Sequence, residues 1–139
     1  MRSTRVLLGA LTFALARSSA IAAIAPADCA AMNNLLRTAR SDFPSLRQMK
    51  MEPGRCSFRA AEYRCGWHFP GDAFDKSDEQ AKRLVGCVAS YTAAQPAKAR
   101  GGDSAFSIDP DLTVVIPAPQ LDGDGWNVLL TIRSSYQQQ

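Results

Sequence analysis

The chain has 139 residues and a formal net charge of +3, from 16 basic and 13 acidic side chains. Three of the basic residues, Arg2, Arg5 and Arg17, fall in the N-terminal leader described below, so the rest of the chain carries 13 charges of each sign. This balance gives no support to a nucleic-acid partner, and the length allows one domain with a modest core. No segment after the leader is long and apolar enough to cross a membrane.

The first 25 residues have the features of a Sec-type signal peptide. Arg2 and Arg5 precede an 11-residue apolar run at 6–16, which is too short to span a bilayer but typical of a signal-peptide core. Small-residue A-x-A sites end at Ala22 and Ala25, and we expect cleavage after one of them. The sequence therefore predicts a periplasmic or secreted protein.

Cleavage would leave a single domain over residues 26–134 and a flexible tail over 135–139. An even number of cysteines in an exported chain predicts disulfides, here two. The cysteines have no C-x-x-C spacing and the chain has one histidine, so neither a metal site nor another cofactor is expected. The four residues concerned are Cys29, Cys56, Cys65 and Cys87.

A first helix is predicted from Cys29 to Arg40, after Asp28. Its apolar residues recur at the spacing of one helix face: Met32, Leu35, Leu36 and Ala39. Pro44 disfavours a helical conformation at Phe43, so the helix should end near there. One further turn could form around Leu46 and Met49.

The segment from Arg55 to Phe69 alternates as a β-hairpin does. An even-numbered loop around Ala60-Ala61 would place Cys56 opposite Cys65 and Phe58 opposite Tyr63. The predicted core-facing side chains are Cys56, Phe58, Tyr63, Cys65, Trp67 and Phe69; the opposite face carries Arg55, Ser57, Arg59, Arg64 and His68. This register favours a Cys56–Cys65 disulfide and leaves Cys29 for Cys87. A connection from the hairpin to the helices remains the alternative.

A second helix is predicted from Ser77 to Tyr91. Its apolar stripe consists of Ala81, Leu84, Val85, Val88 and Tyr91, and Cys87 lies within it. Ser77 and Gln80 have the spacing of a capping box, which would begin the helix at Ser77.

The remaining chain predicts a mobile loop at 92–104 and a second hairpin. Its strands would be 112–116 and 126–133, and Asp122-Gly123-Asp124-Gly125 supplies turn residues between them. The same four residues resemble part of a calcium loop, but Trp126 stands where a third ligand would be needed, so a turn is favoured. The element order α-β-β-α-β-β predicts an α+β fold: a four-stranded antiparallel sheet with two helices on one face.

Candidate catalytic residues are few. His68 is the single histidine, and Asp72 four residues later could orient its imidazole. An aspartate pair drawn from Asp109, Asp111, Asp122 and Asp124 is the other possibility, although aspartates are common in turns for local hydrogen bonding. No G-x-S-x-G motif marks a nucleophilic serine. A small hydrolase acting on an envelope polymer is therefore the alternative function, and no catalytic residue is assigned.

The preferred hypothesis is a binding protein. Arg55, Arg59, Arg64 and His68 form a basic row on one face of the first hairpin, with Arg133 as a candidate fifth member. On the second hairpin, Val115 and Leu129 lie among polar outward-facing residues, as in a modest interface. The sequence thus predicts a small exported, disulfide-stabilised, non-enzymatic protein that binds a protein or envelope-polymer partner.

Overall fold

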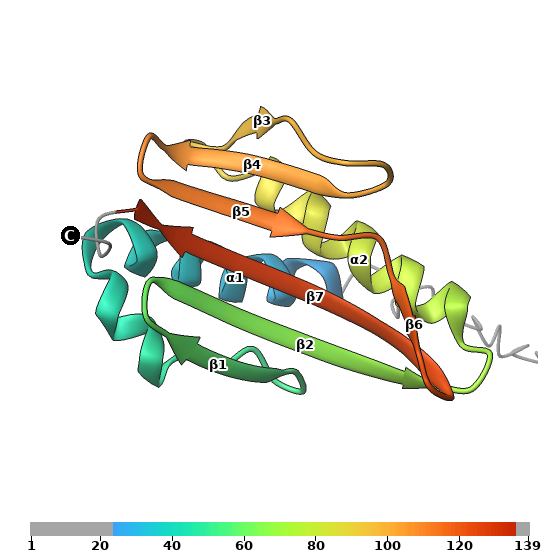
Figure 1. Ribbon diagram of the computed structural model, residues 1–139. Coiled ribbons are helices and arrows are strands. Elements are labelled where there is room, and N and C mark those ends of the chain that lie inside the picture. Colours follow the sequence, from blue (N-terminus) through green and yellow to red (C-terminus); the bar gives the residue numbers. More distant parts are fainter. Residues whose placement is uncertain (1–23, 136–139) are drawn as a thin grey trace, which may run out of the picture.

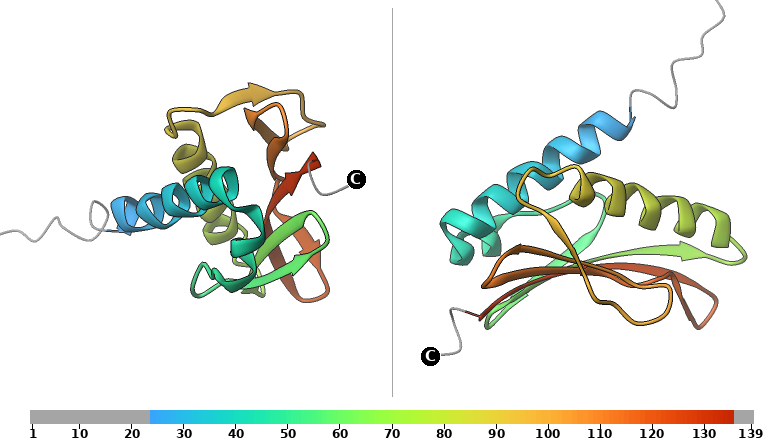
Figure 2. Two further views of the ribbon diagram at one scale, coloured as in Figure 1. Left: turned by 90° about the vertical axis from the view of Figure 1, so that its left-hand side faces the viewer. Right: turned by 90° about the horizontal axis from the view of Figure 1, so that it is seen from above.

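The computed structural model describes residues 24–135 and has an α+β architecture (Figure 1). A seven-stranded antiparallel sheet is covered on one side by two α-helices and a short 3-10 helix (Figure 2). Most of the expected signal peptide, and residues 136–139 of the expected tail, lie outside the described residues. The fold class agrees with the sequence, but the number of strands does not.

The first helix, α1 (Ile24–Ser41), begins five residues earlier than expected. Pro26 is compatible with this start because a proline in the first turn breaks no intrahelical hydrogen bond. The predicted stripe is buried, at Met32, Leu35, Leu36 and Ala39. The expected further turn is the 3-10 helix η1 (Phe43–Gln48), with Pro44 in its first turn.

The second helix, α2 (Phe74–Ala89), begins before the expected capping box and ends two residues before Tyr91. Ser77 is therefore a buried helical residue whose hydroxyl donates to the Phe74 carbonyl oxygen at 2.7 Å. The earlier start is stabilised by the Phe74 ring, which lies edge-on to Trp126 with centroids 4.7 Å apart. Asp75 places a negative charge in the first turn, where the helix dipole favours it.

The first hairpin has the predicted register. Strand β1 (Arg55–Arg59) pairs with β2 (Glu62–Pro70) so that Cys56 faces Cys65 and Phe58 faces Tyr63. Tyr63 is buried, and its hydroxyl donates to the Met49 carbonyl oxygen at 2.9 Å. Burial raises the pKa of Tyr63 to about 12. The Tyr63 hydrogen bond attaches the hairpin to Met49, the residue that follows η1.

The rest of the sheet corrects the four-stranded prediction. The additional strands are β3 (Gln95–Ala97), β4 (Ser104–Asp109) and β6 (Gln120–Asp122); β5 (Leu112–Ile116) and β7 (Gly125–Ser134) match the expected pair. The strand order is β1-β2-β7-β5-β4-β3, and β6 pairs with β7 outside this path. The predicted mobile loop at 92–104 thus contains the edge strand β3, and its last residue, Ser104, begins β4.

Strand β7 runs through the middle of the sheet, between β2 and β5 (Figure 1). One side of it pairs with β2 along nine residues. The other side pairs with β5 at Val115–Thr131 and with β6 at Gln120–Asn127, so β5 and β6 follow it in succession. The chain therefore does not form the expected simple hairpin of two strands. β5 is followed by β6, and the chain then turns at Gly123, where φ is +60°, into β7.

Two disulfides join these elements in the preferred pairing. Cys29–Cys87 connects α1 to α2, and Cys56–Cys65 connects β1 to β2. The core lies between the helices and the inner face of the sheet. Its fully buried side chains include Leu35, Leu36, Leu84, Val88, Tyr63, Val114, Val128, Leu130 and Ile132.

Candidate binding site

The side of the sheet away from the helices is the candidate site, and we call it the open face (Figure 2). The strand register arranges its outward side chains in rows across the strands. One row is Gln120, Asn127 and His68; the second is Arg55, Gly66 and Leu129; the third is Ser57, Arg64, Thr131, Val115 and Ala105; the fourth is Arg59, Glu62, Arg133, Thr113 and Ser107. Residues from six strands therefore contribute to one surface.

The four residues predicted to bind a partner all lie exposed on the open face. Arg55 and Arg59 come from β1, and Arg64 and His68 come from β2. Arg133 joins them from β7. The structure thus brings the predicted basic row together, although binding itself stays a prediction.

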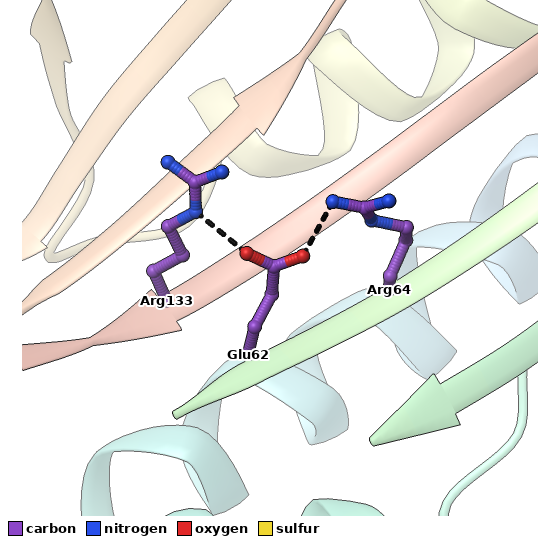
Figure 3. A network of polar contacts seen from close by, with 3 residues as sticks. All are labelled: Glu62, Arg64 and Arg133. Atoms are coloured by element: carbon purple, nitrogen blue, oxygen red, sulfur yellow. Dashed lines mark hydrogen bonds and ion pairs between the residues drawn. The ribbon is translucent and has the colours of Figure 1, made fainter. Parts of the chain in front are cut away.

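Glu62 bridges two of the open-face arginines (Figure 3). One carboxylate oxygen accepts from Arg64 Nη2, and the other accepts from Arg133 Nε at 2.8 Å. Burial acts to raise the pKa of Glu62, but the Arg133 hydrogen bond and the two positive charges outweigh it, and the pKa lies below its usual value. Glu62 therefore stays ionised at neutral pH and offsets only one of the two arginine charges.

His68 is held by the neighbouring strand. Its Nδ1 lies 2.7 Å from Asn127 Oδ1, and the Asn127 amide nitrogen donates to Asp122 Oδ2 at 2.8 Å. Because the Asn127 oxygen is an acceptor, Nδ1 carries the proton. A Cβ at Gly125 would lie 2.6 Å from His68 Cε1, so the imidazole packs against a position that must lack a side chain.

The candidate catalytic pair is not formed. Within residues 24–135, His68 has polar contacts with Asn127 and with Asp124, whose Oδ1 lies 4.0 Å from Nε2, and none with Asp72. A neutral amide cannot compensate a developing imidazolium charge as a carboxylate does. His68 is therefore oriented, but without the partner that general-base catalysis would use.

The four aspartates considered for a catalytic pair lie in two separate turns. Asp109 and Asp111 lie at the β4–β5 turn, where Asp109 Oδ1 accepts from the Asp111 N–H at 2.9 Å. Asp122 and Asp124 lie at the β6–β7 turn, at the other end of β7. The described part of the chain contains no group of three His, Cys, Asp or Glu residues suited to a metal ion.

A hollow of about 620 Å³ opens on the open face over Gly66. Its polar wall includes Arg55, His68 and Asn127, and its apolar wall includes Pro53, Trp67, Phe69 and Leu129. A second hollow of about 510 Å³ lies between the loop after β3 and the sheet. It is lined by Lys98, Ala99, Arg100, Asp103, Ala105, Val115 and Arg133.

The sequence did not indicate Lys98 and Arg100 as members of this surface. Their position depends on the course of the loop between β3 and β4, for which a single sequence carries no periodic signal. The cross-strand partners of Glu62 and His68 were also missed. They follow from the β2–β7 register, which pairs Glu62 with Arg133 and His68 with Asn127.

Comparisons of the chain with protein-family models, with curated proteins and with solved structures found no match. Neither helix in the described residues has the combined length and hydropathy that crossing a membrane requires.

Proposed function

We propose that this protein is a small exported binding protein that acts without catalysis. Its partner is an anionic protein or envelope polymer, and the open face is the contact surface. Two disulfides support a location in an oxidising compartment, because such bonds persist outside the reducing cytosol. The leader at residues 1–25 supports the same location from the sequence.

The observation that carries the proposal is the uncompensated positive charge on the open face. Arg55 and Arg59 form no ion pair with any part of the described chain, and Glu62 is shared between Arg64 and Arg133. No helix among residues 24–135 covers this side of the sheet (Figure 2). A cationic surface of this kind attracts an anionic partner and orients its approach.

The hydrolase alternative has weaker support. His68 borders the hollow over Gly66, and its Nε2 forms no hydrogen bond with any of residues 24–135. Its partner at Nδ1 is an amide rather than a carboxylate, and all four cysteines are oxidised. Binding is therefore the function that the arrangement favours.

The double variant Arg59→Gln/Arg64→Gln tests the proposal by capture of partners from a native envelope extract. We expect the variant to capture much less of the partner, because two cations of the open face are lost. Its melting temperature should stay within a few degrees of the wild type, since exposed ion pairs contribute little to stability.

The matched control is Arg37→Gln/Lys76→Gln, which removes two exposed cations from the helices. It should capture the partner as the wild type does. Equal capture by the open-face variant and the wild type would contradict the proposed function.

A further inference from the structure

We propose that the hollow over Gly66 receives a carboxylate side chain from an extended acidic segment of a partner protein, with Arg55 as its charge partner. This inference rests on the proposed function and specifies the partner. It makes the row Arg55–Gly66–Leu129 a specific subsite within the broader cationic face.

The hollow exists because Gly66 has no side chain at an outward-facing position in the middle of β2. Arg64 and His68 are the next outward residues on either side of it along the strand. Across the strands, Gly66 lies between Arg55 and Leu129. A Cβ at Gly66 would lie 3.2 Å from Leu129 Cδ2, so the Leu129 side chain occupies the space beside the bare backbone.

The lining suits a carboxylate carried on a short apolar stem. The Arg55 guanidinium has no ion-pair partner among residues 24–135, and this group binds carboxylates through two parallel hydrogen bonds. Pro53 and Leu129 offer apolar contact to methylene groups. No acidic side chain lines the hollow itself. Asp122 and Asp124 lie next to its lining residues Asn127 and His68, so the positive charge of the hollow comes from the Arg55 side.

The spacing of the β1 arginines favours an extended polypeptide. Arg55, Ser57 and Arg59 point to the same side of β1, and an extended strand places residues four apart about 13 Å from one another. Carboxylates four residues apart on an extended partner would match the two arginines. β1 is also an edge strand, beside which an extended chain can lie.

The same face is less suited to single-stranded nucleic acids. Binding of single-stranded nucleic acids relies on exposed aromatic rings on which bases stack. No Phe, Tyr or Trp occurs in the outward rows of the open face; Trp67 and Phe69 also line the hollow, but Trp67 is buried and Phe69 packs partly buried against the core. An acidic polypeptide needs no such ring.

The experiment measures fluorescence anisotropy with a labelled peptide of alternating glutamate and threonine, and with an oligogalacturonate of equal charge. Gly66→Val fills the hollow without changing any charge, and Arg55→Gln removes the proposed charge partner. We expect each to weaken peptide binding about tenfold. The salt dependence should decrease only for Arg55→Gln, because only this variant removes a cation.

Thr113→Val is the matched control, since it replaces a hydroxyl with a methyl group on the open face away from the hollow; it should bind as the wild type does. Circular dichroism and thermal unfolding establish that Gly66→Val is folded. Should it not fold, Arg55→Gln decides the question alone, because Arg55 is exposed and its loss does not disturb the core.

Three results would overturn the inference. If Gly66→Val and Arg55→Gln bind the peptide as tightly as the wild type while Arg59→Gln/Arg64→Gln binds weakly, the open face binds anions without the hollow. If the wild type binds oligogalacturonate and not the peptide, the partner is not a polypeptide. If the wild type binds neither anion, the proposed function fails together with the inference.

Discussion

At the scale of single residues, Glu62 links the stability of the sheet to the charge of the open face. It holds Arg64 of its own strand and Arg133 of β7, and in doing so neutralises part of the surface that we propose to bind anions (Figure 3). Stability and binding should therefore respond in opposite directions when its charge is removed.

Glu62→Gln is expected to lower the free energy of unfolding at neutral pH by about 0.5–1 kcal/mol, as for partly exposed ion pairs. The folded-state pKa of Glu62 lies below its usual value of 4.5, so the stabilisation is present above about pH 4.5 and is lost as the pH falls through the folded pKa. Urea unfolding of both proteins between pH 7 and pH 3 measures this. The difference between them should shrink toward the acid end.

The same variant should bind the anionic peptide more tightly than the wild type, because it adds one net positive charge to the open face. A variant that is less stable but not tighter in binding would indicate that the Glu62 network serves the fold alone. A difference in unfolding free energy that does not change with pH would mean that the Glu62 charge is not its cause.

At the scale of the elements, the two disulfides restrain very different lengths of chain. Cys29–Cys87 closes a sequence separation of 58 residues, and Cys56–Cys65 closes one of 9. In the chain-entropy description, a bond across a longer loop removes more freedom from the unfolded state.

Replacing Cys29 and Cys87 by alanine should therefore lower the free energy of unfolding by about 4 kcal/mol, and replacing Cys56 and Cys65 by about 3 kcal/mol. Urea unfolding of the two double variants, compared with the oxidised wild type, measures the order. A larger loss from the hairpin pair would show that local geometry, rather than loop length, determines the contribution of each bond.

The elements that could be predicted from the sequence are those whose periodicity involves large side chains. The first hairpin alternates aromatic residues and cysteines with arginines, which fixed its register and placed the basic row on one face. In β4 only Phe106 and Ile108 are large apolar residues. The other positions include the small residues Ser104, Ala105 and Ser107, so the alternation of apolar and polar side chains is weak. β3 has three exposed residues, including Pro96, and gains its strand geometry from pairing with β4.

The start of α2 was predicted at the wrong residue although its local sequence signal is clear. The local capping signal at Ser77 is chemically sound, but the contact between Phe74 and Trp126 extends the helix by three residues. That contact joins positions 52 residues apart in the sequence, and no local pattern could indicate it. Tertiary packing here outweighs the local preference.

At the scale of the whole molecule, the two disulfides suggest an oxidising compartment, and the proposed export would take the chain there. Expressed with its leader in a bacterial host, the protein should accumulate outside the cytoplasm with an N-terminus at Ala23 or Pro26 and with no reactive thiol. Intact-mass measurement with and without reduction tests both points. Full-length protein with four free thiols would contradict the export proposal.

The two cleavage sites would have different structural consequences. Cleavage after Ala22 would keep all of α1, whereas cleavage after Ala25 would remove its first two residues, Ile24 and Ala25. Cys29 and its bond to α2 would be retained in either case. The remaining part of α1 would thus stay covalently linked to α2 after either cleavage.

The central position of β7 bears on the order of assembly. It is the last strand of the described chain, yet β2 and β5 meet only through it. A polypeptide that ends at residue 124 would lack the strand with which both β2 and β5 pair. The seven-stranded sheet can therefore be completed only when Gly125–Ser134 is available, and a truncation before Gly125 would leave β2 and β5 each with an unpaired edge.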